Sequence, residues 1–158
     1  CVLVTDAQLS LRALSDPAEL ELLQPLYEQS DGPSYGFLQG FLDQPYCRAW
    51  CLVKDRQLVA AIWYQCAAEQ AEMVDLRVLA SERRQGFGSQ LLWASLTALG
   101  DVGAVALEVR SSNAAARALY QSLGFSETGA RPNYYATPDG REDAILMTLT
   151  LNHGGSVT

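Results

Sequence analysis

The feature that most restricts the fold is an almost wholly apolar run at residues 102–109, in which Glu108 is the single charge. A strand of this composition is expected to be covered on both faces, as in a sheet flanked by helices. Residues 113–123 follow with apolar side chains at helical spacing and end at Gly124, a residue favoured just past a helix terminus. This strand–helix pair predicts a layered α/β or α+β fold.

The rest of the chain fits the same class of fold. Asp16 and Pro17 are typical of a helix start, and Asp55-Arg56 separates two strand-like stretches as a hairpin turn would. The apolar patterns predict helices at 16–29, 34–43, 86–99 and 113–123. They predict strands at 9–14, 46–54, 57–66, 71–78, 102–109, 126–135 and 142–151.

The resulting order is β α α β β β α β α β β, a mixed central sheet of about seven strands flanked by four helices. We expect residues 1–151 to form a single domain, which is close to the usual domain size. Residues 152–158 contain Gly-Gly-Ser and are expected to form a flexible C-terminal tail.

Composition narrows the class of partner. The chain has 11 Lys and Arg against 18 Asp and Glu, a net charge of −7, so it has no general attraction for nucleic acid or anionic membranes. No apolar run approaches the ~20 residues of a membrane span, and the first residues lack a secretory pattern. We therefore expect a cytoplasmic protein that binds neither membrane nor nucleic acid directly.

The cysteines and the histidine exclude two kinds of chemistry. Cys47 and Cys51 form a C-x3-C spacing, but no second pair or nearby histidine completes a zinc site. Together with Cys1 and Cys66 they are expected to be reduced thiols in an apolar core. The single histidine, His153, lies in the predicted tail, which argues against a Ser-His-Asp mechanism.

The first segment that suggests chemistry is the strand–turn–helix at 78–89. Gly86 and Gly88 allow close approach to the backbone, and the N–H groups at a helix start favour an anion such as phosphate. Arg83 and Arg84 add positive charge. The R-x-x-G-x-G spacing is neither a P-loop nor a dinucleotide fingerprint, and an ordinary helix-capping turn explains the glycines equally well.

The second such segment begins with Glu108. Burial in an apolar strand would raise the pKa of a carboxyl and make it a better base, whereas a carboxylate paired with an arginine is the alternative. Tyr120 lies two turns into the following helix and is either a reactive phenol or a packing aromatic beside Phe125. Asn113 is either a helix cap or a ligand donor.

Taken together, these motifs resemble the GNAT N-acetyltransferases. Residues 83–88 resemble the acetyl-CoA pyrophosphate loop, and 108–125 resemble the second half of that fold. Residues 131–144 resemble the branch of the family that acetylates the N-terminal alanine of small-subunit ribosomal protein number eighteen. The match is close over 70–151, and over 1–69 it is one of element order only.

The resemblance implies acetyl-CoA as cosubstrate, no metal, Glu108 as general base and Tyr120 as general acid. It implies cofactor contacts at Leu76, Val78, Arg83, Arg84, Gln85, Gly86, Phe87, Gly88, Ser89, Asn113 and Ala116. It implies acceptor contacts at Tyr35, Asp75, Asn133, Tyr134 and Tyr135. Since neighbouring residues of a strand face opposite ways, we expect only one of the last two tyrosines to wall the acceptor slot.

The implied acceptor is the basic N-terminal peptide of a ribosomal protein, which suits an acidic chain; Glu82, Glu142 and Asp143 are candidate contacts or, alternatively, solvated surface charges. Two departures from the family lie on this side. The segment between the first two predicted helices reads Gly32-Pro33-Ser34-Tyr35, with no Trp, where the family usually carries a Pro-Trp pair. Asp75 and Arg77 stand where the fourth strand usually has small or neutral residues.

Other functions stay open at this point. A GNAT enzyme could instead acetylate a lysine side chain or a small-molecule amine. A non-catalytic acetyl-CoA-binding module would need neither Glu108 nor Tyr120, so the presence of both argues against it. A nucleic-acid-binding role has the least support, because no basic face is evident. We expect a monomer.

Overall fold

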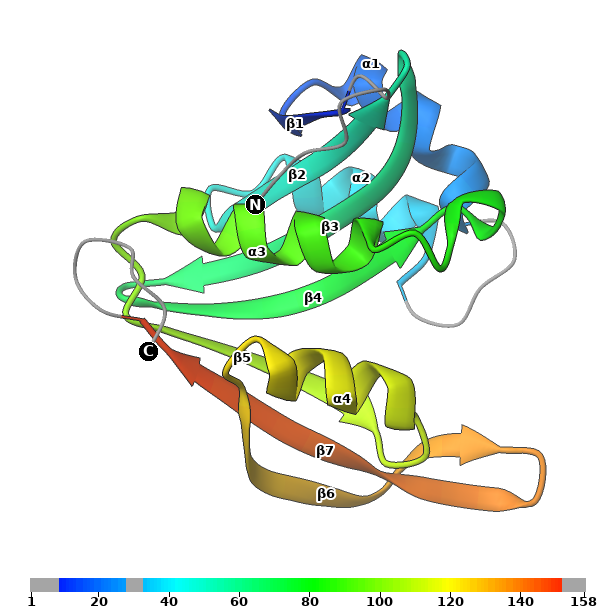
Figure 1. The fold of residues 1–158 in the computed structure, drawn as a ribbon, viewed down its shortest axis with the longest axis vertical. Helices are drawn as coiled ribbons and strands as arrows, with labels where there is room; N and C mark the ends of the chain where they lie inside the picture. Colours follow the sequence, from blue (N-terminus) through cyan, green and yellow to red (C-terminus); the bar gives the residue numbers. More distant parts are fainter. Residues whose placement is uncertain (1–8, 28–32, 152–158) are drawn as a thin grey trace. The chain divides into compact units, whose positions relative to one another are not determined.

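The computed structural model describes residues 9–27 and 33–151 (Figure 1). Its seven strands follow the order β1-β2-β3-β4-β5-β7-β6. Strands β4 and β5 pair in parallel, whereas β1–β2, β2–β3, β5–β7 and β6–β7 pair antiparallel, so the predicted mixed sheet is confirmed. The strands are β1 (Leu9–Ala13), β2 (Cys47–Lys54), β3 (Gln57–Ala67), β4 (Gln70–Val78), β5 (Ala104–Arg110), β6 (Ser126–Thr137) and β7 (Gly140–Thr150).

The helices also follow the predicted order. They are α1 (Pro17–Leu20), the 3-10 helix η1 (Glu21–Tyr27), α2 (Tyr35–Leu42), the 3-10 helix η2 (Ala80–Glu82), α3 (Phe87–Leu99) and α4 (Ala114–Ser122). Within the described residues no helix is long and apolar enough to cross a membrane. The predicted tail at 152–158, Cys1 and His153 lie outside the described residues.

The chain divides into two compact units that share β4. Among the described residues, the first unit contains those from 9 to 66 and 74–98, and therefore β1, β2, β3 up to Cys66, the second part of β4, helices α1, η1 and α2, and α3 up to Ala98. The second contains residues 67–73 and those from 99 onward, and therefore the start of β4, β5, α4, β6 and β7. The prediction of a single domain over 1–151 stays a prediction.

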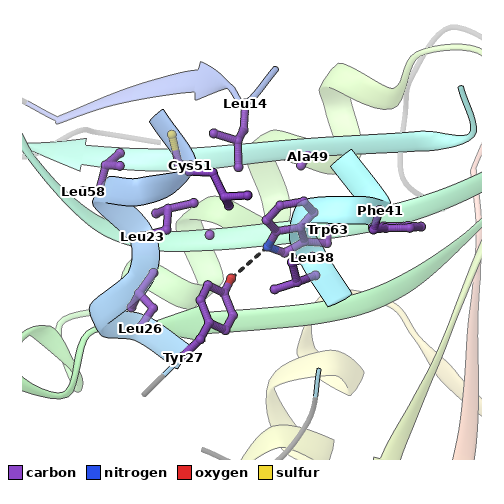
Figure 2. Packing of buried hydrophobic residues seen from close by; sticks show 12 residues of the cluster. Leu14, Leu23, Leu26, Tyr27, Leu38, Phe41, Ala49, Cys51, Leu58 and Trp63 are labelled. Carbon is purple, nitrogen blue, oxygen red and sulfur yellow. Dashed lines mark hydrogen bonds between the residues drawn. The ribbon is translucent and has the colours of Figure 1, made fainter. Parts of the chain in front are cut away.

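Strand β3 forms the centre of the first unit and is buried along most of its length. Trp63 lies on one face, in the cluster formed with η1 and α2 (Figure 2), and its indole N–H donates to the Tyr27 hydroxyl at 2.8 Å. The next residue, Tyr64, contacts α3 on the other face, where its hydroxyl is 2.7 Å from that of Ser95. Alternation along the strand therefore sends successive side chains to two helical layers.

In the second unit, β5 is buried on one face only. Val105, Leu107 and Val109 are buried, whereas Ala104, Ala106 and Glu108 on the opposite face are partly or fully exposed. The expectation of burial on both faces is therefore wrong for this strand. The reason is that this unit has one helix, α4, among its described residues, and the small alanines expose little apolar surface on the other face.

Two local features differ from or refine the expectations. The helix predicted at 16–29 is a single α-helical turn that continues as η1, which contains Pro25, a residue with no N–H to donate; Gln29 lies outside the described residues. The predicted hairpin is confirmed, and φ values of 49° at Asp55 and 69° at Arg56 are those of a two-residue turn that matches the strand twist.

Candidate active site

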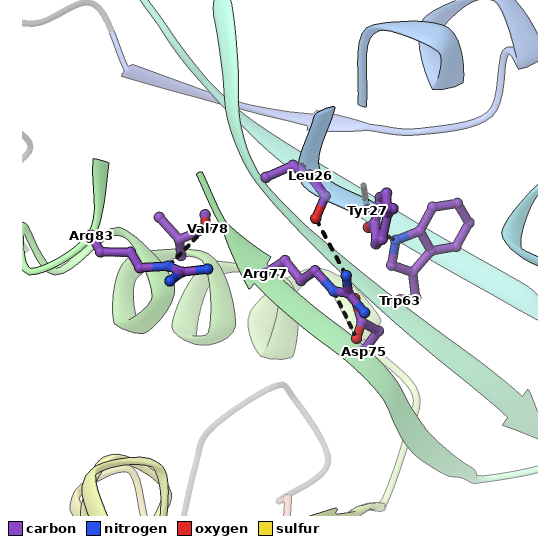
Figure 3. A network of polar contacts seen from close by, with 7 residues as sticks. All are labelled: Leu26, Tyr27, Trp63, Asp75, Arg77, Val78 and Arg83. Carbon is purple, nitrogen blue, oxygen red and sulfur yellow. Dashed lines mark hydrogen bonds and ion pairs between the residues drawn. The ribbon is translucent and has the colours of Figure 1, made fainter. Parts of the chain in front are cut away.

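The predicted site residues fall into two groups, one in each unit. The group in the first unit is centred on the chain between β4 and α3. Left-handed backbone at Arg84 (φ 65°) and Gly86 (φ 80°) bends this chain into the start of α3. The Arg83 Nε donates to the carbonyl oxygen of Val78 at 3.2 Å, which ties the loop to the end of β4 (Figure 3).

The start of α3 offers unused backbone donors. The first helical hydrogen bond of this turn runs from the Gln90 N–H to the Gly86 carbonyl at 3.0 Å, so the N–H groups of the preceding helical residues have no acceptor within the helix. A Cβ added at Gly88 would lie 3.5 Å from Val78 Cγ2, whereas a Cβ added at Gly86 would have no atom within 4 Å. Since Arg84, Gln85 and Gly86 are exposed, an anion has access to this turn.

Phe87 differs from its neighbours in this loop. Its side chain is buried, with Lys54 Nζ 5.5 Å from the ring centroid, so Phe87 anchors the loop and offers only its backbone to a ligand. The same Lys54 forms an ion pair with Glu82 at 2.9 Å. Glu82, a candidate peptide contact, therefore has an internal partner.

The predicted acceptor residues of the first unit are partly buried. Tyr35 is the first residue of α2, which Ser34 caps by accepting from the Phe37 N–H at 3.1 Å, and it packs against the hydrophobic cluster of this unit. Asp75 is paired with Arg77 at 3.0 Å. Burial raises the pKa of the Asp75 carboxyl to about 6, against the opposing effect of the Arg77 charge. Leu76, between them, is also partly buried.

The group in the second unit is centred on Glu108. Its carboxylate Oε1 lies 3.2 Å from Arg131 Nη2, with the Glu108 side chain 19% and the Arg131 side chain 54% exposed. The arginine-paired carboxylate that the sequence left open as an alternative is thus what the structure contains. The exposure of Arg131 leaves it free to move away from Glu108, because a surface ion pair of this kind is weak.

Tyr134 and Tyr135 both have contacts within this group, and the expectation that only one of them walls the acceptor slot stays a prediction. Pairing with β7 is irregular between Arg131 and Tyr135, and Asn133 has a φ of 53°. This irregularity interrupts the alternation of the strand and brings the two rings edge to face, with centroids 5.0 Å apart. The Arg131 guanidinium lies 5.3 Å from the ring centroid of Tyr134.

Tyr135 connects the Glu108 pair to β5 and β7. Its ring lies 4.5 Å from the Arg110 guanidinium. Burial raises the pKa of Tyr135, and the negative charge of Glu108 raises it further.

Glu142 holds the turn between β5 and α4. Its carboxylate accepts from the Ser112 N–H at 2.9 Å and from the Ser111 hydroxyl at 3.2 Å, and it pairs with Arg110 at 3.4 Å. The hydrogen bond from the Ser112 backbone is the main reason that the pKa of Glu142 is lowered. Asp143 likewise accepts from the Asn133 N–H at 3.0 Å. Both acidic residues therefore have internal partners.

In α4, the structural alternatives for the predicted residues are observed. The Asn113 side chain accepts from the Ala116 N–H at 3.1 Å and caps the helix. Tyr120 is buried and its ring packs against Phe125, with centroids 5.8 Å apart. Capping uses the oxygen of Asn113, so its amide N–H group is the part that could donate to a ligand.

The described cysteines have no disulfide partners. Cys51 is fully buried, as expected, whereas Cys47 and Cys66 are only partly buried. Burial raises the pKa of both Cys47 and Cys51 to about 11, which keeps these thiols protonated near neutral pH. Among residues 9–27 and 33–151, no cluster of three or more His, Cys, Asp or Glu side chains could hold a metal ion.

The sequence did not single out Arg131, Arg110 or Tyr27. Their contacts depend on strand register and on the packing of η1, which sequence spacing does not supply. The available signal was strand spacing: Arg110 stands two residues from Glu108, and therefore on the same face of one strand.

The chain matches the acetyltransferase (GNAT) family over residues 14–125, and it belongs to this family of acyltransferases. Its relatives include the [ribosomal protein bS18]-alanine N-acetyltransferases. It is 43% identical to that of Escherichia coli K12 over 103 residues, 64% of this chain and 70% of the relative. It is 35% identical to that of Haemophilus influenzae over 103 residues, 63% of this chain and 70% of the relative.

Solved structures agree with this assignment. The crystal structure of the ribosomal-protein-S18-alanine N-acetyltransferase of E. coli matches with a TM-score of 0.85 and 31% identity, covering 96% of each chain. A spermidine N-acetyltransferase of Vibrio cholerae matches with a TM-score of 0.78 and 18% identity over 90% of this chain and 94% of the other. The second match shares the fold alone. The predicted GNAT fold and acetyltransferase class are confirmed.

Proposed function

We propose that this enzyme transfers an acetyl group from acetyl-CoA to the α-amine of the N-terminal alanine of ribosomal protein bS18. The observation that carries the proposal is the 43% identity to the E. coli enzyme named for this reaction. We further propose that it acts in the cytoplasm as a monomer. An acidic chain, with net charge −7, suits a basic peptide as acceptor.

Acetyl-CoA fits the exposed turn at the start of α3. The backbone N–H groups from Gln85 to Ser89 would hold the pyrophosphate, with Arg83 and Arg84 beside it. Leu76 and Val78 of β4 and Asn113 and Ala116 of α4 would contact the pantetheine arm. The Val78 N–H would also donate to the thioester oxygen. The thioester supplies an acetyl group that an amine can take without a metal.

The reacting amine must first lose a proton. An α-ammonium has an ordinary pKa near ~8, so most of it is protonated at neutral pH. Glu108 would accept this proton, directly or through a water molecule. The free amine then attacks the thioester carbon, the new C–N bond replaces the C–S bond, and Tyr120 would donate a proton to the departing thiolate.

We assign acceptor contacts to Tyr35 in the first unit and to Asn133, Tyr134 and Tyr135 in the second. The paired tyrosine rings offer a wall for the first residues of a peptide. Because Glu82, Glu142 and Asp143 already have internal partners, we assign the attraction for a basic peptide to the overall charge instead of to these three residues.

A competition experiment tests the acceptor class. The enzyme is given acetyl-CoA and three competing amines at equal concentration. The first is an Ala-initiated bS18 peptide with a free α-amine. The second is that peptide with its α-amine blocked and a lysine added inside the sequence, and the third is spermidine. Mass spectrometry should find acetyl only on the free α-amine. Acetyl on the lysine or on spermidine instead would contradict the proposed acceptor while leaving the enzyme class intact.

A further inference from the structure

A buried ion pair lies on β4 of the first unit. Asp75 and Arg77 are two residues apart and so share one face of the strand. Arg77 Nε donates to both carboxylate oxygens, at 3.3 Å and 3.0 Å, and the two side chains are only 11% and 9% exposed (Figure 3). Such a pair costs desolvation energy, and removing one partner leaves an uncompensated buried charge.

Arg77 also reaches another element. Its Nη1 donates to the Leu26 carbonyl at 3.3 Å, and its guanidinium lies 4.5 Å from the ring centroid of Tyr27. These are the last two residues of η1, where the helix carbonyls have no N–H donor within the helix and need another donor. The Tyr27 hydroxyl in turn accepts from Trp63 of β3. The end of η1 is therefore held from two strands.

The same cluster supports the start of α2. Leu26, Tyr27 and Trp63 belong to the buried core of this unit, and Tyr35 packs against that core. A change in how Arg77 holds η1 would therefore displace Tyr35 through the core that they share, since close-packed interiors transmit small displacements.

We propose that Asp75 and Arg77 act as a positioning pair, in which Asp75 orients the Arg77 guanidinium, Arg77 fixes the end of η1, and this anchorage sets the affinity for the acceptor amine without affecting acetyl-CoA binding. The inference rests on the proposed function, because that function makes Tyr35 an acceptor contact. Asp75 is then a residue that acts through Arg77 instead of touching the peptide.

The interaction between Asp75 and Arg77 should depend on pH, because the Asp75 carboxyl can take up a proton. The charged and titratable groups that act on Asp75 and Tyr27 are Arg77 of the same strand, the two residues themselves and Cys51 of β2. Burial raises the pKa of Asp75 to about 6, so the carboxylate takes up a proton as the pH falls through that value. Protonation removes the charge that orients Arg77, and the anchorage should weaken below about pH 6.

The test compares Asp75→Asn with wild type across pH. Asparagine keeps the shape of the side chain and removes the charge. At pH 7.5 the variant should have a peptide KM raised roughly fivefold, the size of one lost hydrogen bond, with the acetyl-CoA KM unchanged. At pH 5.5 the ratio of the two peptide KM values should fall towards one, because Asp75 of the wild type is then largely protonated. Glu72→Gln, at an exposed position of the same strand, is the charge-matched control and should leave both KM values unchanged.

A second readout does not need activity. The indole N–H resonance of Trp63 should titrate with a midpoint near pH 6 in wild type and stay constant in Asp75→Asn, because the Asp75 charge acts on Tyr27. Arg77→Met should raise the peptide KM, and Arg77→Lys, which keeps the positive charge, should raise it less.

A KM ratio that is constant across pH, or an equal rise in the acetyl-CoA KM, would overturn the positioning role. So would a Trp63 resonance that does not titrate. If wild type fails to acetylate the peptide, the proposed function fails, and the Trp63 titration alone then decides whether the pair holds η1.

Discussion

Glu108 of β5 and Arg131 of β6 form an ion pair, with Oε1 and Nη2 3.2 Å apart, on the face of the sheet that also carries Tyr134 and Tyr135. The carboxylate assigned as general base is therefore already held by a cation. An arriving α-ammonium carries the same charge as this guanidinium, and the partly exposed Arg131 can give way to it. The Arg131 guanidinium therefore lies beside the Glu108 carboxyl group before the acceptor binds.

Replacing the base should stop the chemistry and spare binding. For Glu108→Gln we expect kcat to fall by at least about 100-fold, the usual contribution of a general base, while the KM for acetyl-CoA stays within about twofold. Steady-state kinetics at pH 7.5 measures both. An unchanged kcat would move the base to another residue.

Removing only the counter-ion should have a different effect. For Arg131→Gln we expect kcat to change little and the KM for the peptide to fall about two- to fivefold. The reason is that Arg131 no longer competes with the peptide ammonium for the Glu108 carboxylate, and an exposed ion pair is weak. Arg56→Gln removes the same charge from the exposed hairpin turn of the first unit and should leave the peptide KM unchanged. Equal effects of the two substitutions would indicate a general charge effect and would contradict the competition.

The hydroxyl of Tyr120 should matter for turnover more than for folding. Tyr120→Phe keeps the ring against Phe125 and removes the proton donor. We expect kcat to fall by at least about tenfold, within the range of general acid catalysis, and Tm to change by only a few degrees. A large loss of Tm with normal kcat would instead make Tyr120 a packing residue alone.

Gly86 should be needed for its backbone conformation. A Cβ there meets no atom within 4 Å, but the φ of 80° is strained for alanine. Gly86→Ala should therefore distort the turn and raise the acetyl-CoA KM several-fold, as strain on the order of 1 kcal/mol would. Gly40→Ala is the matched control: its Cβ also meets nothing, but it lies inside α2, where alanine is favoured. Gly40→Ala should leave the KM unchanged and stabilise the fold slightly.

Glu142 gives a pH-dependent contribution to stability with a definite sign. Because its pKa is lowered in the folded state, the ionised carboxylate stabilises the fold above the ordinary carboxyl range, and this stability is lost as the pH falls through the lowered value. Glu142→Gln should therefore be less stable than wild type at pH 7 and equally stable once the pH lies below the lowered pKa of Glu142. Urea unfolding at both pH values measures the difference. A stability deficit of the same size at both would show that the charge is unimportant.

Much of the fold could be predicted because local signals agree with the long-range structure. The hairpin at Asp55-Arg56, helix α3 and helix α4 followed from turn and spacing patterns that do not depend on other elements. The one-sided burial of β5 could not be predicted, because alanines at 104 and 106 look equally apolar whether or not a helix covers them. The continuation of α1 as η1 reflects Pro25, which the leucine pattern obscured.

The residues of the candidate site could be proposed from the sequence, but their pairings could not. Glu108, Tyr120 and Gly86, for which we propose catalytic or cofactor-binding roles, stand in motifs that the sequence displays directly. The partners of Glu108 and Asp75 depend on register and on side-chain direction. The interrupted alternation at Tyr134 and Tyr135 depends on an irregularity in β6 that the regular strand rule excludes.

Acetyl transfer to a protein α-amine releases one CoA per acetyl group, so CoA release measures the proposed activity. The enzyme is mixed with acetyl-CoA and a short Ala-initiated peptide that copies the basic N-terminus of bS18, and in parallel with the same peptide whose α-amine is blocked. We expect CoA release with the free amine and none above background with the blocked peptide. Equal release with both peptides, or no release with the free amine despite measurable acetyl-CoA binding, would contradict it.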